Sequence, residues 1–371
     1  MVGGHAHYPC AMATFPLTRT EHPTPDEERE RRLVKPGFGV TFSDHLAVMT
    51  WTPQTGWTDR QVRPYAPFQL DPAATVLHYA QEVFEGLKAY AHPDGSVWSF
   101  RPQSNAARLN ASARRLGLPE VAEDDFLDAI AALVAADRDW VPTGAEQSYY
   151  LRPFMFGTNP SLAVAPAQEV TFCVIGSPSD AYFATGVQPV SIWLTTEYTR
   201  AAPGGTGAAK CGGNYAASMV AQAEARAHGC DQVAFVDAVE RAWLEELGGM
   251  NIMAITDTGE LHTPELTGTI LPGVTRDALL QLAREDGLTV VERRLGVGDL
   301  LADIDAGRVT ELFACGTAAI ITPIKSLTDA AGTHVVGDGT AGEATLRLRR
   351  TLTDVQSGHR DDEHGWMYPL A

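Results

Sequence analysis

Lysine is scarce in this chain, which has only Lys35, Lys88, Lys210 and Lys325 while the other 24 of its 28 basic residues are arginines. Acidic residues outnumber basic ones, and the formal net charge is −18. Nucleic-acid binding needs a concentrated basic surface, so this balance argues against a nucleic-acid partner. The chain also lacks an apolar run long enough to span a bilayer, which argues against a membrane protein.

Cysteine is sparse as well, with five residues, no CxxC pair and no Cys/His cluster at zinc spacing. We therefore expect neither a disulfide framework nor a metal site, and we interpret the thiols as reduced. The first seventeen residues have no basic region and no continuous apolar segment, so they do not resemble a signal peptide. These features together predict a cytoplasmic protein.

The length of 371 residues is more than one ordinary core needs and fits two domains. Residues 1–35 are rich in proline, threonine and charge, which predicts a loosely attached arm. Residues 36–180 have the pattern of a small α+β domain. The stretch SPSDAYFATGVQPV (177–190) has the composition of a linker, which we place at 181–192. A larger domain with alternating helices and strands is predicted at 193–371.

Hydrophobic periodicity and helix-end signals locate the main elements. In the first domain they predict helices over 103–117 and 123–137 and strands over 148–157 and 168–176. In the second domain helices are expected at 214–228, 275–286 and 297–307, and strands at 233–237, 251–257, 260–263, 288–294 and 309–316.

Lys210 lies in PGGTGAAKCGGNYA (203–216), with five glycines within six residues of it. Lysine forms Schiff bases when desolvation or a cationic neighbour lowers its pKa, so a lone lysine in such a segment suggests a nucleophilic amine. A surface lysine in a mobile glycine loop is the better interpretation from position alone. The neighbouring segments favour the nucleophile.

Two segments in the same half have the pattern of anion sites. ILPGVTR (270–276) places Thr275 at a helix start, where free N–H groups and the dipole favour an anion. CGTAAI (315–320) places Gly316 and Thr317 directly after a strand. Each segment taken singly is better explained as an N-cap or a turn. Together with an isolated lysine they favour a phosphorylated cofactor.

Three charged residues complete the candidate chemistry. Glu245 and Glu246 precede two glycines, and a carboxylate there could hold a proton on a ring nitrogen, as pyridoxal phosphate requires. The alternative is a solvated acidic turn. Arg108 lies in the middle of a predicted helix, and the alternative for it is a surface salt bridge of little worth.

Seven segments, in order along the chain, resemble the branched-chain amino-acid aminotransferases, and most closely the longer subgroup with the animal and mycobacterial enzymes. They are VFEGLKAY (83–90), FRPQSNAARLNASARRL (100–116), YYLRP (149–153), AKCGGNYAASM (209–219), ELGGMNI (246–252), ILPGVTR (270–276) and FACGTAA (313–319). The resemblance runs from about residue 40 to the C-terminus. It implies fold type IV of the pyridoxal-phosphate enzymes, with a small α+β domain and a larger mixed α/β, barrel-like domain.

The resemblance also implies roles for single residues. Lys210 matches the Schiff-base lysine that also moves the substrate Cα proton, and Tyr215 matches the tyrosine on the cofactor's phenolic oxygen. Glu246, rather than Glu245, matches the partner of the pyridine nitrogen. The implied phosphate ligands are Arg108, Val274, Thr275 and Thr317, with Arg200 less firmly placed near the phosphate.

On the substrate side the resemblance implies an aromatic pocket for a branched side chain. Arg152 would bind the distal carboxylate of glutamate, and Ala318 would help hold the α-carboxylate. The remaining pocket residues would be Tyr79, Phe84 and Tyr150. Two departures stand out, because Ala319 and Thr322 replace a redox CxxC of the animal enzymes and Gly249 replaces a threonine.

The resemblance therefore implies a homodimeric transaminase in branched-chain amino-acid biosynthesis. It would exchange amino groups between L-leucine, L-isoleucine or L-valine and 2-oxoglutarate by a ping-pong mechanism. A D-amino-acid aminotransferase or a pyridoxal-phosphate lyase of the same fold is the nearest alternative. A ligand sensor that keeps the cofactor site and a cofactor-free scaffold are alternatives from other classes. The sequence does not rank the three amino acids, because one methylene is worth about 1–3 kcal/mol in such a pocket.

Overall fold

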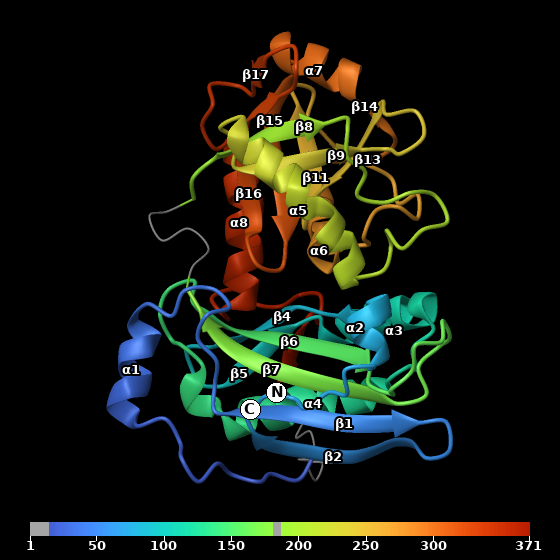
Figure 1. Cartoon of the computed structure of the whole chain (residues 1–371). Coiled ribbons are helices and arrows are strands. Elements are labelled where there is room, and N and C mark those ends of the chain that lie inside the picture. The colour runs from blue at the N-terminus through green and yellow to red at the C-terminus, as the bar shows by residue number, and fades with distance from the viewer. Residues whose placement is uncertain (1–14, 181–186) are drawn as a thin grey trace.

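The computed structural model describes residues 15–180 and 187–371, and they form two sheets with helices packed against them (Figure 1). The first sheet has eight strands in the order β18-β5-β4-β6-β7-β1-β2, with β3 paired to β6. Their bounds are β1 His45–Thr52, β2 Gly56–Pro64, β3 Glu82–Phe84, β4 Leu87–Ala91, β5 Val97–Phe100, β6 Ser148–Gly157, β7 Val170–Ser179 and β18 Met367–Pro369.

Four helices accompany the first sheet, and α3 and α4 contribute most of the helical residues of its main core. Their bounds are α1 Asp26–Val34, α2 Thr75–Tyr79, α3 Pro102–Leu116 and α4 Glu123–Ala136, with a 3-10 turn at Arg138–Trp140. Three acidic residues in the first turn of α4 complement its dipole, and its buried face includes Phe126 and Ile130. Helix α3 begins with a proline and is capped after Leu116 by Gly117, whose φ of 67° suits glycine.

The second sheet has ten strands in the order β13-β12-β11-β15-β16-β8-β9-β10-β14, with β17 paired to β16. Parallel pairs (β12 with β13, β8 with β9 and with β16) stand beside antiparallel ones, so the sheet is mixed. The bounds are β8 Val190–Thr195, β9 Gln232–Val236, β10 Trp243–Leu247, β11 Asn251–Thr256, β12 Glu260–Thr263, β13 Thr289–Glu292, β14 Leu295–Gly296, β15 Val309–Gly316, β16 Ile320–Thr328 and β17 Thr333–Val335. Its helices are α5 Gly212–Ala227, α6 Val274–Glu285, α7 Val297–Asp305 and α8 Glu343–Gln356.

The architecture confirms the predicted fold class, an α+β unit joined to a larger mixed α/β unit. The exact boundaries of the domains stay a prediction. Two strands, however, do not follow the expected division of the chain. Strand β8 begins at Val190, inside the expected linker 181–192. Strand β18 lies in the expected second domain by sequence, but it pairs with β5 of the first sheet.

The described part of the predicted arm, residues 15–35, is attached to the first sheet at its start. Residues 1–14 lie outside the described part of the chain. Phe15 is 1% exposed and belongs to the core of the first sheet, and Leu17 forms a parallel bridge with Val62. The polar composition of 1–35 hides this attachment, because a single buried aromatic side chain hardly changes the average of a segment.

Candidate active site

A cavity of about 190 Å³ lies where the two units meet, and it gathers nearly all the predicted site residues. The first unit contributes Phe84, Arg108, Tyr150 and Arg152. The second contributes Lys210, Tyr215, Glu246, Val274, Thr275, Thr317 and Ala318. Of the residues predicted for the site, Tyr79 and Arg200 do not line the cavity.

Lys210 is held at the junction by both units. Its backbone N–H donates to Ser112 Oγ at 2.9 Å, and its carbonyl accepts from the Phe84 N–H at 3.0 Å. Its Nζ donates to the Tyr215 hydroxyl at 2.9 Å and lies 5.1 Å from the centroid of the Phe84 ring. Tyr215 stands in the first turn of α5, so the fold fixes both the amine and the phenol beside the cavity.

Glu246 lies on β10 and is buried, so the solvated-turn interpretation is wrong for this pair. Its carboxylate accepts from the Leu271 N–H at 2.8 Å and from Asn251 Nδ2 at 3.1 Å, and it forms an ion pair with Arg200. Burial raises the pKa of Glu246 to about 7, although the Arg200 guanidinium acts in the opposite direction. The site therefore contains a carboxylate whose charge depends on the groups around it.

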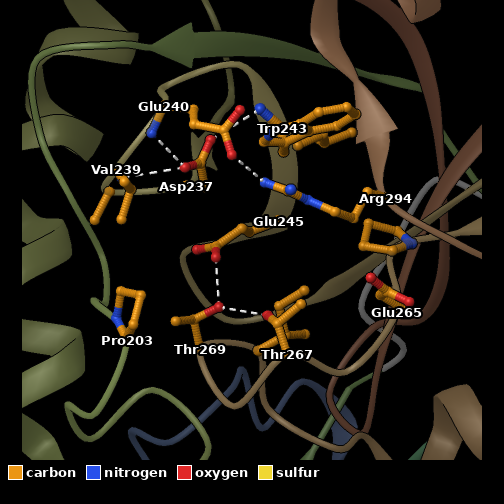
Figure 2. A pocket seen from close by; sticks show the side chains of 14 residues that line it. Pro203, Asp237, Val239, Glu240, Trp243, Glu245, Glu265, Thr267, Thr269 and Arg294 are labelled. Atoms are coloured by element: carbon orange, nitrogen blue, oxygen red, sulfur yellow. Dashed lines mark hydrogen bonds and ion pairs between the residues drawn. The ribbon is translucent and has the colours of Figure 1, made fainter.

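Glu245 has a different environment from its neighbour. It lines a separate cavity of about 310 Å³, with Trp243 and Arg294 on its wall (Figure 2). There its carboxylate accepts a hydrogen bond from the Thr269 hydroxyl, and burial raises its pKa. The structure thus separates the two glutamates and brings only Glu246 to the cavity that holds Lys210.

Arg108 is buried, so the surface salt bridge considered for it is wrong. Its guanidinium donates to Glu85 through Nε at 2.7 Å and Nη2 at 2.8 Å. Nη1 donates to the Pro272 carbonyl at 3.1 Å, which links α3 to the loop before α6. Although burial acts to raise it, the pKa of the fully buried Glu85 is lowered by Arg108. Sequence reasoning missed Glu85, because a glutamate in a strand-like segment gives no signal of its partner.

The N-terminus of α6 faces the same cavity. Val274 and Thr275 are its first residues, and the first N–H groups of a helix have no partner within it. Gly273 precedes them, and a Cβ there would lie 2.1 Å from Asn251 Oδ1. The turn between β15 and β16 adds Thr317 to the cavity wall. A helix terminus, a buried arginine and two hydroxyl groups make this end suitable for a phosphate.

Another part of the cavity wall is aromatic. Tyr150 and Arg152 lie on one face of β6, and Arg152 Nη2 donates to the Tyr150 hydroxyl at 3.1 Å. The Arg152 guanidinium also lies 4.8 Å from the centroid of the Phe84 ring. Phe38 lines the cavity with its ring centroid 5.1 Å from that of Tyr150, and sequence reasoning missed it. The only signal was one aromatic residue between two glycines, in PGFGV (36–40).

Two predicted residues lie elsewhere. Tyr79 ends α2, is 40% exposed, and donates from its hydroxyl to the Leu162 carbonyl. Arg200 donates to the carbonyls of Gly207 and Thr269, at 2.9 Å each, and pairs with Glu246. Arg200 therefore contacts the cavity indirectly, through the Glu246 carboxylate.

Other kinds of site were searched for in residues 15–180 and 187–371. No group of three or more histidine, cysteine or acidic side chains there could hold a metal ion. Within the same ranges no helix is both long and apolar enough to cross a membrane. Four cysteines in these ranges, Cys173, Cys211, Cys230 and Cys315, are buried and unpaired.

Comparison with known proteins identifies the class. The model of the amino-transferase class IV family matches residues 82–327, so the chain belongs to that family of enzymes. Within it the chain belongs to the branched-chain-amino-acid aminotransferases. It is 52% identical to the protein of that name from Mycolicibacterium smegmatis, over 96% of this chain and 98% of the relative. A probable branched-chain-amino-acid aminotransferase of Streptomyces coelicolor is 54% identical over 96% of this chain and 99% of its own length.

Solved structures agree with this assignment. The Escherichia coli branched-chain amino acid aminotransferase has a TM-score of 0.72 and 27% identity, over 88% of this chain and 99% of that one. Another solved branched-chain amino acid aminotransferase, which contains pyridoxamine 5'-phosphate, has a TM-score of 0.71 and the same identity and coverage. The family resemblance stated from the sequence is confirmed.

Proposed function

We propose that this enzyme exchanges the amino group between L-leucine, L-isoleucine or L-valine and 2-oxoglutarate, with pyridoxal 5'-phosphate in the cavity at Lys210. The observation that carries the proposal is the convergence of three groups in one cavity. An amine, a buried carboxylate and an anion-binding helix terminus come from Lys210, Glu246 and α6. The branched-chain aminotransferases to which the chain is similar support the choice of substrates.

The residues of the cavity fit this cofactor. Arg108, Thr275, Thr317 and the N–H groups that begin α6 would hold the phosphate. Lys210 would carry the cofactor covalently, and Tyr215 would donate to its phenolic oxygen. Glu246 would keep the ring nitrogen protonated. When bound, the cofactor supplies an electron sink that stabilises the negative charge left on the substrate Cα when its proton is removed.

The side chains would then divide the chemistry among them. Lys210 Nζ would take the proton from the Cα of the amino-acid substrate as a general base and, in the second half-reaction, deliver a proton to the Cα of the 2-oxo acid as a general acid. Tyr215, 2.9 Å from that nitrogen, would hold the amine in place between the two transfers. Arg200, the Leu271 N–H and Asn251 would stabilise the ionised Glu246 against the cost of its burial.

One cavity would serve both half-reactions. Phe38, Phe84 and Tyr150 would surround a branched aliphatic side chain. Arg152, beside two of these rings, would receive the distal carboxylate of glutamate or 2-oxoglutarate. Because the two substrates would occupy the same space in turn, ping-pong kinetics follow.

We also propose a cytoplasmic homodimer. The buried, unpaired cysteines support a reducing compartment. The dimer is an expectation from the resemblance, and sedimentation of the purified protein tests it.

The deciding experiment is the near-visible absorbance of the purified protein with pyridoxal phosphate during addition of L-isoleucine, without any oxo acid. A yellow band that bleaches supports the proposal. A band that responds only to a D-amino acid would overturn the substrate assignment, and a colourless protein would overturn the cofactor. Lys210→Ala should lose turnover by several orders of magnitude, whereas Lys325→Ala, at an exposed lysine, should keep it.

A further inference from the structure

A second lysine of the four, Lys88, is buried beside the candidate active site and has no part in the chemistry proposed above. It lies on β4 and is 4% exposed. In the ladder between β4 and β6 it stands opposite Tyr150, so both side chains leave the same face of the first sheet. Tyr150 lines the cavity, and this face is therefore turned toward the second unit.

Lys88 reaches across to the second unit. Its Nζ donates to the Ala318 carbonyl at 2.9 Å. Ala318 belongs to the turn between β15 and β16, which lines the cavity through Gly316, Thr317 and Ala318. The Ala318 carbonyl shares its planar peptide unit with the Ala319 N–H, so a donor on this carbonyl fixes the orientation of the unit that follows Ala318 in the turn.

The two charged side chains near Lys88, Arg349 and Glu146, bind each other, and the Lys88 amine donates to the Ala318 carbonyl. Burial lowers the pKa of Lys88 to about 8, with Arg349 acting in the same direction and Glu146 in the opposite one. Arg349 and Glu146 are bound to each other by two hydrogen bonds, of 2.8 and 2.7 Å. A buried amine is costly unless its donors are used, which gives the bond to Ala318 its importance.

The same turn contains a backbone conformation that its sequence does not favour. Ile320, which begins β16, has a φ of 62°. The left-handed region is rare for a β-branched residue and persists only where surrounding contacts enforce it. The turn is therefore held in its shape from outside, and Lys88 supplies one such contact from the other unit.

We propose that Lys88 is a positioning residue that fixes the turn at Thr317 and Ala318 to receive the α-carboxylate of the substrate. The inference rests on the proposed function and extends it, because every amino acid and 2-oxo acid in the reaction carries that carboxylate. Lys88 does not line the cavity and would act only through the turn.

The first test measures the steady-state constants of the holoenzyme with substrates that carry an α-carboxylate. Lys88→Met keeps the length of the side chain and removes the donor. We expect KM for L-isoleucine and for 2-oxoglutarate to rise about tenfold, the effect of one lost hydrogen bond, with kcat changed less. The cofactor absorbance should stay unchanged. Lys325→Met, at an exposed lysine on β16, is the matched control.

A single-turnover measurement with and without the α-carboxylate separates a positioning role from a general loss of activity. The bleaching rate at subsaturating L-isoleucine should fall about tenfold in Lys88→Met, whereas the rate with 2-methylbutylamine, which lacks the carboxylate, should not change. Lys88→Arg, which keeps donors and charge, should recover part of the loss. Equal slowing with both compounds, or slowing with neither, would overturn the inference.

Two further measurements keep the test decisive. If Lys88→Met does not fold, Lys88→Gln is measured instead, and the carboxylate-selective loss must appear there. Wild-type protein that does not bleach with L-isoleucine would refute the proposed function, and this is seen before any variant is compared.

Discussion

At the scale of single residues, two adjacent glutamates show how environment divides one residue type into two roles. Glu246 accepts from Leu271 and Asn251 in the cavity that holds Lys210, whereas Glu245 lies in a separate cavity and accepts from Thr269. The sequence indicated a carboxylate here and the resemblance chose Glu246. Their burial and the Arg200 ion pair arise from segments far apart along the chain.

The raised pKa of Glu246 gives a prediction for the stability of the cofactor-free protein. In the unfolded chain its carboxyl has the ordinary pKa of 4.5, and in the folded protein the pKa is about 7. Folding therefore gains a contribution that is fully present below pH 4.5 and is lost as the pH rises through 7. Glutamine does not titrate, so Glu246→Gln does not lose stability in this way as the pH rises. Its free energy of unfolding, relative to wild type, should therefore rise by about 2–3 kcal/mol between about pH 5 and pH 8.

Urea denaturation at several pH values measures this difference. Glu265→Gln, at an exposed glutamate on the wall of the other cavity, controls for the removal of one carboxylate. A difference between Glu246→Gln and wild type that stays flat across this pH range would contradict the prediction.

At the scale of elements, the sequence predicted helices and strands best where caps and periodicity agree. Predicted helices 103–117 and 275–286 correspond to α3 and α6 within one residue at each end. Helix α8 and strand β16 received no prediction, although both are long. Strand β16 is buried on most of its length and has no alternation that marks a strand, because it lies inside the second sheet.

The arm at 15–35 gives a prediction at this scale. Phe15 is 1% exposed in the core of the first sheet, so Phe15→Ala should lower the free energy of unfolding by about 3–5 kcal/mol. Val34→Ala on α1, where the side chain is 79% exposed, should change it by less than about 0.5 kcal/mol. Urea denaturation compares the two, and a Phe15→Ala protein as stable as wild type would mean that the arm is loosely attached.

At the scale of the whole molecule, the two units are tied together by contacts distant in sequence. Arg349 of α8 pairs with Glu146 of the first unit, and Arg108 of α3 donates to the Pro272 carbonyl. The C-terminal strand β18 crosses back to the first sheet, where it pairs with β5. Figure 1 shows the end of the chain beside that sheet, below the unit to which most of the second half belongs.

Removal of residues 367–371 should therefore destabilise the first unit although the cut falls at the other end of the chain. Leu370 is 8% exposed in its core, and Val97 exchanges backbone hydrogen bonds of 2.8 and 2.7 Å with Leu370 and Ala371. The expected loss is about 3–5 kcal/mol, from one buried side chain and a few strand hydrogen bonds. Thermal denaturation measures it against Ala371→Gly, which keeps the backbone, and an unchanged midpoint would contradict it.

The sequence by itself determined the family of this protein and indicated its chemistry, because local patterns in the right order carry both. Lys210 among glycines, the helix start at Thr275 and the strand end before Thr317 are each visible within a few residues. Only the tertiary structure decided what surrounds them. Glu85 beneath Arg108, Arg200 beside Glu246, Phe38 in the cavity and Lys88 on the Ala318 carbonyl are partners separated by up to 230 positions. Such pairs form when the sheets pack together and exclude water. The periodicity of residues along the chain does not predict them.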